Sequence, residues 1–147
     1  MIYTVMFLIL AFDQITKYLA LQNITQPITV TSFLNFILVF NKGVSFSLFS
    51  FDKKSMTWLL TVIIILITGY FVKWMFETKQ KFLKFCLALI CGGAVGNLID
   101  RFRYGAVVDF IDFHIGVRHW PAFNIADSAV CIGAAFLLIY SFTVKDR

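Results

Sequence analysis

Two carboxylates lie inside apolar stretches of the sequence, where an ionised group is costly. Asp109 interrupts the run Val-Val-Asp-Phe-Ile, and Asp127 stands near the start of a long apolar segment. Two carboxylates that meet at the edge of a low-dielectric region cannot both ionise comfortably, so they share one proton. The ionised member can then activate water while the protonated member donates to a scissile carbonyl. Such a pair suits peptide hydrolysis.

Asp127 also has a structural interpretation. Asn124 follows Pro121 closely and can cap a helix, which leaves Asp127 near the third helical position, where the helix dipole stabilises a carboxylate. This interpretation does not explain Asp109, because an acid embedded in an apolar run has its pKa raised by desolvation unless it finds a partner. Both interpretations of Asp127 therefore stay open.

Other catalytic arrangements have little support in the sequence. His114 and His119 are five residues apart and lack an HExxH-like partner, so a zinc site is disfavoured. Ser45, Ser47 and Ser128 lack a GxSxG context and an obvious base. We expect no metal and no other cofactor.

The composition indicates that lipid surrounds this chain. Of its 147 residues, 60% are hydrophobic and only 14% are charged, which is far from the composition of a soluble domain. The net charge of +5 comes from basic residues at the ends of apolar runs. We therefore expect membrane lipids with anionic headgroups as partners, and no nucleic acid.

Four apolar runs are long enough to cross a membrane as helices. They are approximately residues 2–21, 56–75, 83–99 and 122–144. The length leaves no room for a soluble domain, so residues 1–147 are expected to form one membrane domain. Residues 28–49 are rich in Thr, Val, Ile and Phe, which predicts short strands at the membrane surface that turn at residues 41–43. The predicted fold class is an all-α membrane protein with four transmembrane helices and a small surface-lying β-like extracytoplasmic segment.

The density of lysines decides the predicted orientation. Basic residues are nearly balanced between the two sides, but the short connection after the second run packs four lysines around its turn. The connection over residues 22–55 spreads three lysines over more than thirty residues. Lysine-dense short loops favour the cytoplasm, so we expect both termini inside and the connections over residues 22–55 and 101–120 outside.

Polar residues inside the apolar runs gather at one end of the expected bundle, because successive spans run in opposite directions. Each ionisable residue within a span is a functional candidate. These residues are Asp13 and Lys17 in the first run, Asn97, Asp100 and Arg101 ending the third, and Asn124 and Asp127 beginning the fourth. The sequence therefore predicts one polar site at the end that carries the two long connections.

Several of these residues have simpler interpretations. Asp13 and Lys17 are four residues apart with the acid first, which suits a structural ion pair on one helix. Asn97 and its neighbours could mark a helix end that meets water instead of a site wall. Gly92 and Gly96 form a small-xxx-small pair that admits a neighbouring helix.

Five sequence blocks resemble those of the lipoprotein signal peptidase family, also called signal peptidase II. They are DQITK at 13–17, NKGVSF at 41–46, GGAVGNLIDR at 92–101, VVDF at 107–110 and FNIAD at 123–127. The corresponding family patterns are DxxTK, NxGxxF, GGAxGNxxDR, VVDF and FNxAD. The second block carries Val44 where the family usually has alanine. The five blocks keep their order over most of the chain.

The resemblance implies a membrane endopeptidase that removes the signal peptide from prolipoproteins, cutting before the diacylglyceryl-modified cysteine. It implies that Asp109 and Asp127 are the catalytic pair and that Asp13 and Lys17 provide structural support. The residues expected to bind substrate or shape the site are Asn41, Gly43, Asn97, Asp100, Arg101 and Asn124. The resemblance also implies a place in the bacterial cytoplasmic membrane, an extracytoplasmic active site and binding of globomycin-type inhibitors. A monomer is expected.

A small proton-coupled transporter or channel subunit is the main alternative, with Asp13, Asp109 and Asp127 carrying protons. Four spans are few for alternating access, and the sequence has no internal repeat. A purely structural subunit is a further alternative, but it leaves the acidic residues without a use.

Overall fold

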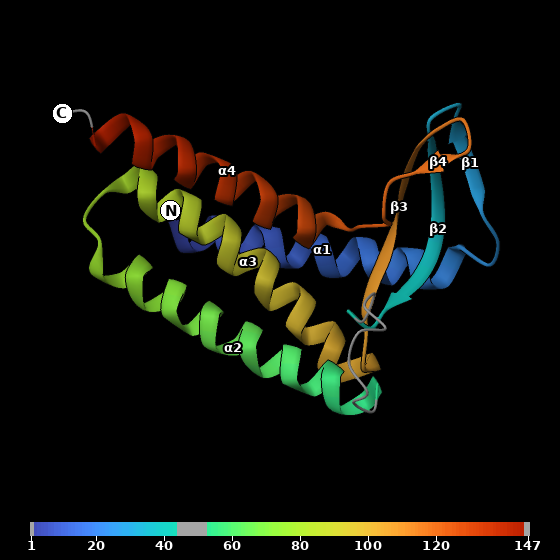
Figure 1. Cartoon of the computed structure of the whole chain (residues 1–147), viewed down its shortest axis with the longest axis horizontal. Helices are drawn as coiled ribbons and strands as arrows, with labels where there is room; N and C mark the ends of the chain where they lie inside the picture. The colour runs from blue at the N-terminus through green and yellow to red at the C-terminus, as the bar shows by residue number, and fades with distance from the viewer. Residues whose placement is uncertain (1, 44–52, 146–147) are drawn as a thin grey trace.

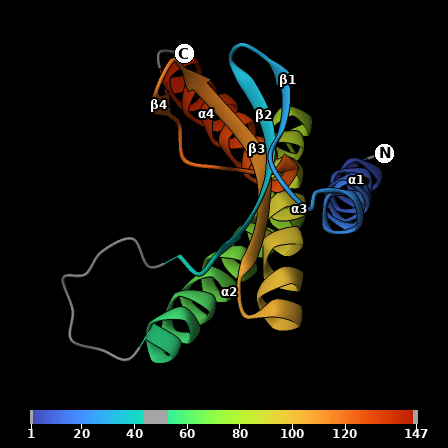
Figure 2. The ribbon, with the colours of Figure 1, turned by 90° about the vertical axis from the view of Figure 1, so that its right-hand side faces the viewer.

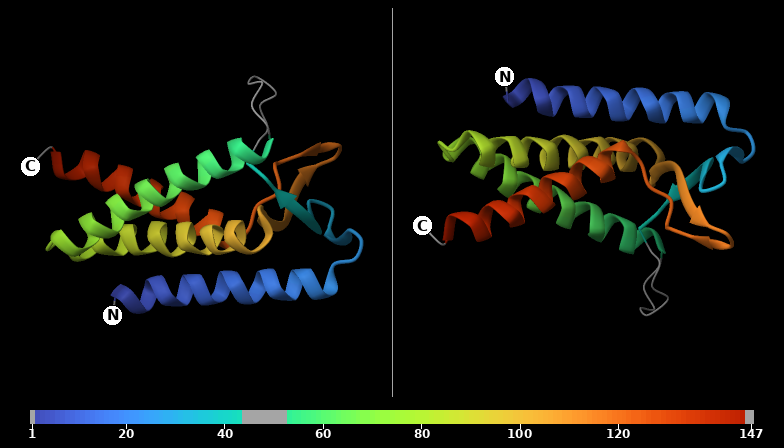
Figure 3. Two further views of the ribbon diagram at one scale, coloured as in Figure 1. Left: turned by 90° about the horizontal axis from the view of Figure 1, so that it is seen from below. Right: turned by 90° about the horizontal axis from the view of Figure 1, so that it is seen from above.

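Four long helices form a bundle that carries a small antiparallel sheet at one end (Figure 1). The structure, a computed structural model, describes residues 2–43 and 53–145. The helices are α1 (Ile2–Asn23), α2 (Lys53–Glu77), α3 (Lys81–Tyr104) and α4 (Ile125–Lys145). Each contains a segment long and apolar enough to cross a membrane, which confirms the predicted fold class. The start of α1, the end of α4 and the α2–α3 turn lie at the end opposite the sheet (Figure 3).

Helix α3 is the centre of the bundle. Helices α1, α2 and α4 each pack against it, and the end-on view shows them arranged around it (Figure 2). The apolar window of α3 is 56% buried, against 17% in each of the other three helices. The outer helices therefore present most of their apolar side chains to lipid, whereas α3 supplies the core.

The close approach of α1 to α3 depends on two glycines. A β-carbon on Gly92 would lie 2.9 Å from the carbonyl oxygen of Met6, and one on Gly96 would lie 2.5 Å from the carboxylate of Asp13. A larger residue would push α1 outward at position 92 and would displace at least the Asp13 side chain at position 96. The predicted small-residue contact is confirmed, and α1 is the neighbouring helix.

The sheet joins the two long connections of the chain. Its strands follow the order β1-β2-β3-β4, each antiparallel to its neighbours. They are β1 (Ile28–Thr31), β2 (Leu34–Asn41), β3 (Val107–Ile115) and β4 (Arg118–His119). The prediction of strands in the first connection is confirmed, but the longest strand, β3, lies in the second connection and was not predicted. Its sequence is rich in Val, Ile and Phe, which favour strands, so a signal was present.

The turn between β1 and β2 is not where the sequence suggested. The two strands join at Ser32 and Phe33, whereas residues 41–43 end β2. Gly43 does adopt a positive φ of 73°, so the glycine marks a change of chain direction but not the hairpin turn. The prediction of a hairpin turn at residues 41–43 is wrong, because β2 continues the extended chain as far as Asn41 to pair with β3. Val44, Ser45, Phe46 and Ser47 lie outside the described residues.

The α3–α4 contact generates a stability prediction at Gly93. A β-carbon there would overlap the carbonyl oxygen of Ala126 and lie 2.9 Å from Cγ2 of Val130. We expect Gly93→Ala to lower the thermal unfolding temperature of the protein in detergent micelles, because α4 must move away from α3.

The matched control is Gly69→Ala in α2, where a β-carbon would meet nothing within 4 Å. Alanine favours a helix by about 1 kcal/mol over glycine, so this variant should be at least as stable as the parent. Equal unfolding temperatures for Gly93→Ala and the parent would contradict the close contact.

Candidate active site

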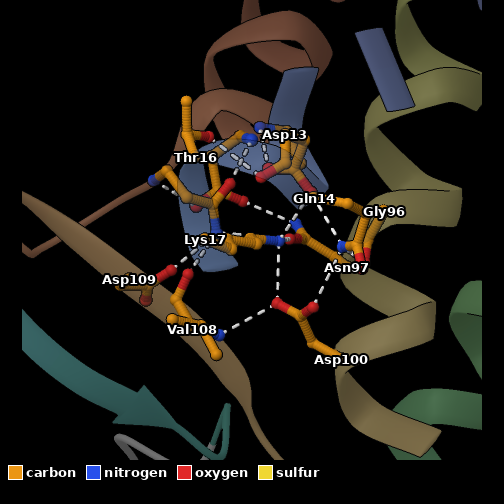
Figure 4. Close-up of polar contacts among 12 residues, drawn as sticks. Asp13, Gln14, Thr16, Lys17, Gly96, Asn97, Asp100, Val108 and Asp109 are labelled. Carbon is orange, nitrogen blue, oxygen red and sulfur yellow. Dashed lines mark hydrogen bonds and ion pairs between the residues drawn. The ribbon is translucent and has the colours of Figure 1, made fainter. Parts of the chain in front are cut away.

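A buried lysine organises the polar side chains at the sheet end of the bundle (Figure 4). Nζ of Lys17 lies 2.9 Å from Oδ2 of Asp13 and 2.8 Å from Oδ2 of Asp100, and it donates to Oδ1 of Asn97 at 2.9 Å. Lys17 is only 2% exposed. The predicted pairing of Asp13 with Lys17 is confirmed, and the same ammonium also joins α1 to α3.

The two carboxylates bound by Lys17 reach further elements. Oδ1 of Asp13 accepts a hydrogen bond from the backbone N–H of Ala126 in the first turn of α4, at 2.9 Å. Oδ2 of Asp100 accepts one from the backbone N–H of Val108 in β3, at 3.0 Å. The residues that follow Ala126 and Val108 are the two candidate catalytic aspartates. Lys17, Asp13, Asp100 and Asn97 form a lysine cluster. This cluster therefore holds the backbone beside each candidate catalytic aspartate.

Asn97 links this cluster to Asp127. A lysine ammonium only donates, so the side-chain oxygen of Asn97 must face Lys17. The amide nitrogen then points the other way and donates to Oδ1 of Asp127 at 2.8 Å. The buried charge thereby fixes which end of the amide the carboxylate receives.

Asn124 caps α4 and also contacts the second aspartate. Its Oδ1 accepts the backbone N–H of Asp127 at 2.9 Å, and Oδ2 of Asp127 accepts the backbone N–H of Asn124 at 3.2 Å. This reciprocal pair confirms the predicted helix cap and explains why α4 begins at Ile125. The remaining end of the Asn124 side chain, Nδ2, donates to Oδ1 of Asp109 at 2.7 Å.

Asn41 completes the environment of Asp109 through the register of β2 and β3. Asn41 pairs with Val107, so Asp109 lies two residues further along β3 on the same face. The backbone N–H of Gly43 donates to Oδ1 of Asn41 at 2.8 Å, and Nδ2 of Asn41 donates to Oδ2 of Asp109 at 2.9 Å. Each oxygen of Asp109 thus accepts one amide.

The surroundings of Asp109 favour its protonated form more than water does. Burial raises the pKa of Asp109 to about 6, and the nearby charge of Asp127 also raises it. The amides of Asn41 and Asn124 oppose this effect, because they stabilise the ionised carboxylate. Protonated and ionised Asp109 are therefore both accessible under physiological conditions.

A cavity of about 330 Å³ opens between α2, α3 and α4 beside these residues. Asn41, Asn97, Arg101 and Asp127 form its polar end. The other lining residues are largely apolar: Ile64, Ile67, Thr68, Phe71, Ile90, Ala94, Val107 and Val130. The cavity therefore leads from the two-aspartate region into the apolar part of the bundle.

Arg101 is a cation at the polar end of this cavity. It is 8% exposed, and its Nε and Nη1 atoms have no hydrogen-bond partner within residues 2–43 and 53–145. A β-carbon on Gly43 would lie 3.0 Å from Nη2 of Arg101, so the glycine leaves space for the guanidinium. The positive charge lies close enough to Asp109 and Asp127 to interact with both.

Three polar contacts were not predicted from the sequence. Gln14 donates to Oδ1 of Asp100 at 3.1 Å, which adds a second helix contact at the lysine cluster. Asp112 binds Asn35 at 3.1 Å, and Nδ1 of His119 lies 2.8 Å from its carboxylate. Burial alone would raise the pKa of Asp112, but the hydrogen bonds from His119 and Asn35 outweigh it and hold that pKa below its usual range. His119 is thus the partner of a strand acid.

The structure brings the ten candidate site residues predicted from the sequence to one end of the bundle. They are Asp13, Lys17, Asn41, Gly43, Asn97, Asp100, Arg101, Asp109, Asn124 and Asp127. They come from α1, β2, the residues after β2, α3, β3 and the start of α4. Their individual catalytic and binding roles stay predictions.

Comparison with known proteins assigns the chain to a family. Residues 5–143 match the model of the family described as signal peptidase (SPase) II. The chain belongs to the signal peptidase II family. With its four apolar helices, this family member is a multi-pass bacterial membrane peptidase.

Relatives and solved structures agree with the family. The chain is 45% identical over 135 residues to the lipoprotein signal peptidase of Polynucleobacter necessarius, covering 89% of this chain and 82% of the relative. It is 40% identical over 136 residues to that of Vibrio parahaemolyticus, covering 88% and 80%. A bacterial membrane enzyme solved by the in meso method at 1.9 Å resolution superposes with a TM-score of 0.75, at 34% identity, covering 93% of this chain and 89% of the other.

The lysine cluster generates a stability prediction. Lys17→Met removes the ammonium and leaves two buried carboxylates facing each other, which should cost about 3–5 kcal/mol of unfolding free energy. Denaturation of the detergent-solubilised protein measures this cost.

Lys73→Met is the matched control, because Lys73 pairs with Glu77 at 3.7 Å through side chains that are 73% and 62% exposed. Removal of such a pair should cost at most about 0.5 kcal/mol. If both variants lose equally little stability, Lys17 does not hold the cluster together.

Proposed function

We propose that this chain is an aspartic endopeptidase that removes signal peptides from prolipoproteins and cuts before the diacylglyceryl-modified cysteine. Membership of the signal peptidase II family supports the substrate class. The observation that carries the mechanism is the placement of Asp109 and Asp127 beside one cation, each held by asparagine amides of fixed orientation. Two carboxylates in this setting can divide the roles of acid and base.

The two aspartates take different roles because their surroundings differ. Asp127 accepts hydrogen bonds from Asn97 and from the backbone at the N-terminus of α4, which stabilise its ionised form. Asp109, with its raised pKa, holds the shared proton. Asp127 is therefore the general base and Asp109 the general acid.

The reaction follows from this assignment. Asp127 takes a proton from a water molecule as the water oxygen attacks the scissile carbonyl carbon, and Asp109 donates its proton to the carbonyl oxygen. The resulting tetrahedral diol collapses when the C–N bond breaks. Asp127 then gives its proton to the leaving amine, and one hydroxyl proton returns to Asp109, which restores the starting state.

The cavity between α2, α3 and α4 suits the substrate near the scissile bond. Its apolar walls accept apolar side chains of the signal peptide, and the free N–H groups of Arg101 can bind peptide carbonyls. Asn41, Gly43 and Asn97 shape the polar end, Asn124 holds Asp109, and Asp100 supports β3. We propose that globomycin-type inhibitors occupy this same region.

The mechanism predicts that the two aspartates act as one unit. Asp109→Asn and Asp127→Asn each keep the shape but remove the acid–base cycle, so each should reduce turnover by roughly 10²-fold or more. The double variant should be hardly worse than either single variant. The assay is cleavage of a diacylglyceryl peptide by purified protein, with binding of a globomycin-type inhibitor as the measure of an intact site.

Asp112→Asn is the internal control, because Asp112 is also buried in β3 but binds Asn35 and His119. It should retain most of the activity. An inactive Asp112→Asn beside an active Asp109→Asn, or activity that is lost to a chelator and restored by metal, would contradict the two-aspartate mechanism.

The hydrogen bond from Asn41 generates a pH prediction. Activity should fall as pH rises through the pKa of Asp109, about 6 in the free enzyme, because the acid must be protonated. Asn41→Ala removes a donor that stabilises the ionised form, so the pKa of Asp109 should rise. The upper limb of the kcat/KM profile should therefore move to higher pH, even though the rate itself falls.

Asn35→Ala is the control for this profile. Asn35 donates to Asp112 from the same strand, so its loss should leave the upper limb in place. If the upper limb of the kcat/KM profile moves equally in Asn41→Ala and Asn35→Ala, or in neither variant, Asp109 is not the acid.

The orientation proposed is one with both termini in the cytoplasm and the site at the extracytoplasmic surface. The chain supplies all the site residues named above by itself, which supports a monomer. With Cys131 replaced by serine, Gln26→Cys at the sheet end should react with a membrane-impermeant maleimide on intact cells. Lys79→Cys in the α2–α3 turn should react only after permeabilisation, and the reverse pattern would invert the orientation.

A further inference from the structure

Three phenylalanine rings form a row across the outer part of the sheet. Phe33 stacks on Phe113 with ring centroids 6.3 Å apart and planes at 8°, and Phe113 stacks on Phe123 at 5.8 Å and 20°. The rings come from the β1–β2 turn, from β3 and from the segment that leads into α4. Phe33 and Phe113 remain 52% and 42% exposed, although each contributes to a stacked row.

The row faces the side of the sheet from which α4 descends into the bundle. Phe113 lies four residues after Asp109 in β3, so both side chains share one face of the strand. Asp109 binds Asn124 at the start of α4, which identifies this face as the one toward α4. Figure 2 shows the β3–β4 hairpin over α4, and Figure 1 shows it at the end of the bundle beyond that helix. The rings therefore lie on the face of β3 that turns toward the start of α4, in a hairpin that extends over this helix.

The same rings line a cavity with a volume of about 780 Å³. Ile115 and Trp120 extend its apolar wall and are 85% and 70% exposed, and Arg118 also lines it. The adjacent turn residue Val117 is 95% exposed. A tryptophan such as Trp120 at the end of a membrane span is typical of the boundary between lipid tails and headgroups.

We propose that this cavity, the overhang site, binds a phospholipid of the leaflet next to the sheet. One acyl chain lies against Phe33, Phe113 and Trp120, and the phosphate binds the guanidinium of Arg118, whose forked donors match phosphate oxygens. Among residues 2–43 and 53–145, Asp112 is engaged by His119 and Arg118 forms no ion pair, so the charge of Arg118 is available to the phosphate. A lipid seated here supports β3, the strand that carries Asp109, at a fixed height over the membrane.

A single-tryptophan reporter tests the proposal without any substrate. Replacement of Trp58 and Trp74 by phenylalanine leaves Trp120 in the overhang site. Phosphatidylglycerol brominated on its acyl chains is added to the purified protein in detergent. The expected result is saturable quenching of Trp120 emission, together with protection of Trp120 from aqueous acrylamide.

Three variants make the test more specific. Arg118→Gln should weaken the apparent affinity for phosphatidylglycerol about fivefold, as for one cation at an anionic lipid surface. Ile115→Asp places a charge in the apolar wall and should abolish saturable quenching. Val30→Asp is its matched control, because Val30 is an apolar residue of β1 that is 47% exposed and does not line the cavity. It should leave the quenching unchanged.

Three outcomes overturn the proposal. If acrylamide still reaches Trp120 and the brominated lipid does not quench its emission, the overhang site lies in water. Quenching that rises without saturation indicates general partition into the micelle and no lipid site. Quenching only by a diacylglyceryl peptide with brominated chains assigns the cavity to the lipid of the substrate. Because none of these readouts uses cleavage, the proposal can fail while the proposed protease activity holds.

Discussion

The burial of one lysine between two carboxylates is the constraint on which the rest of this structure depends. Lys17 is 2% exposed, and Asp13 and Asp100 are at most 1% exposed, so none of the three charges could remain buried alone. The cluster draws α1 against α3, and its acids bind the backbone of α4 and of β3. A buried ion pair adds little net stability, but its strict geometry leaves few alternative arrangements of the elements that it joins.

The cluster also orients the two aspartates, because the asparagine side chains that contact them can make all their hydrogen bonds in only one orientation. Asn97 must turn its oxygen to Lys17, and Asn124 must turn its oxygen to the N–H groups of α4. Each therefore presents its N–H to a carboxylate. In the proposed mechanism these donors are held in place before the reaction and need no reorganisation during it, which is how a preorganised site lowers a barrier.

The structural and functional interpretations of Asp127 prove to be compatible. The carboxylate completes the cap of α4 through the backbone of Asn124 and still receives the amide of Asn97. The packing of the helices also serves both the fold and the site. Glycines close α1 and α4 tightly onto α3, whereas the space between α2, α3 and α4 stays open as the cavity beside the two acids.

The sequence by itself determined those features that arise within one element. Four apolar runs gave the spans, their alternating direction placed the polar residues at one end, and spacings of three or four residues gave the Asp13–Lys17 pair and the Asn124 cap. Such contacts follow from helix geometry alone. Polar and apolar alternation likewise indicated strands in the first long connection.

Only the tertiary structure decided the contacts between elements. The reach of Lys17 to Asp100 and Asn97 depends on how closely the glycines let α1 approach α3. The contact of Asn41 with Asp109 depends on the register of β2 against β3, which shifts at an irregularity between Phe36 and Val39. A shift of one residue would turn every following side chain to the other face of the strand, and no local pattern encodes it. Register and helix approach are set by the packing of whole elements, so they exist only once the chain has folded.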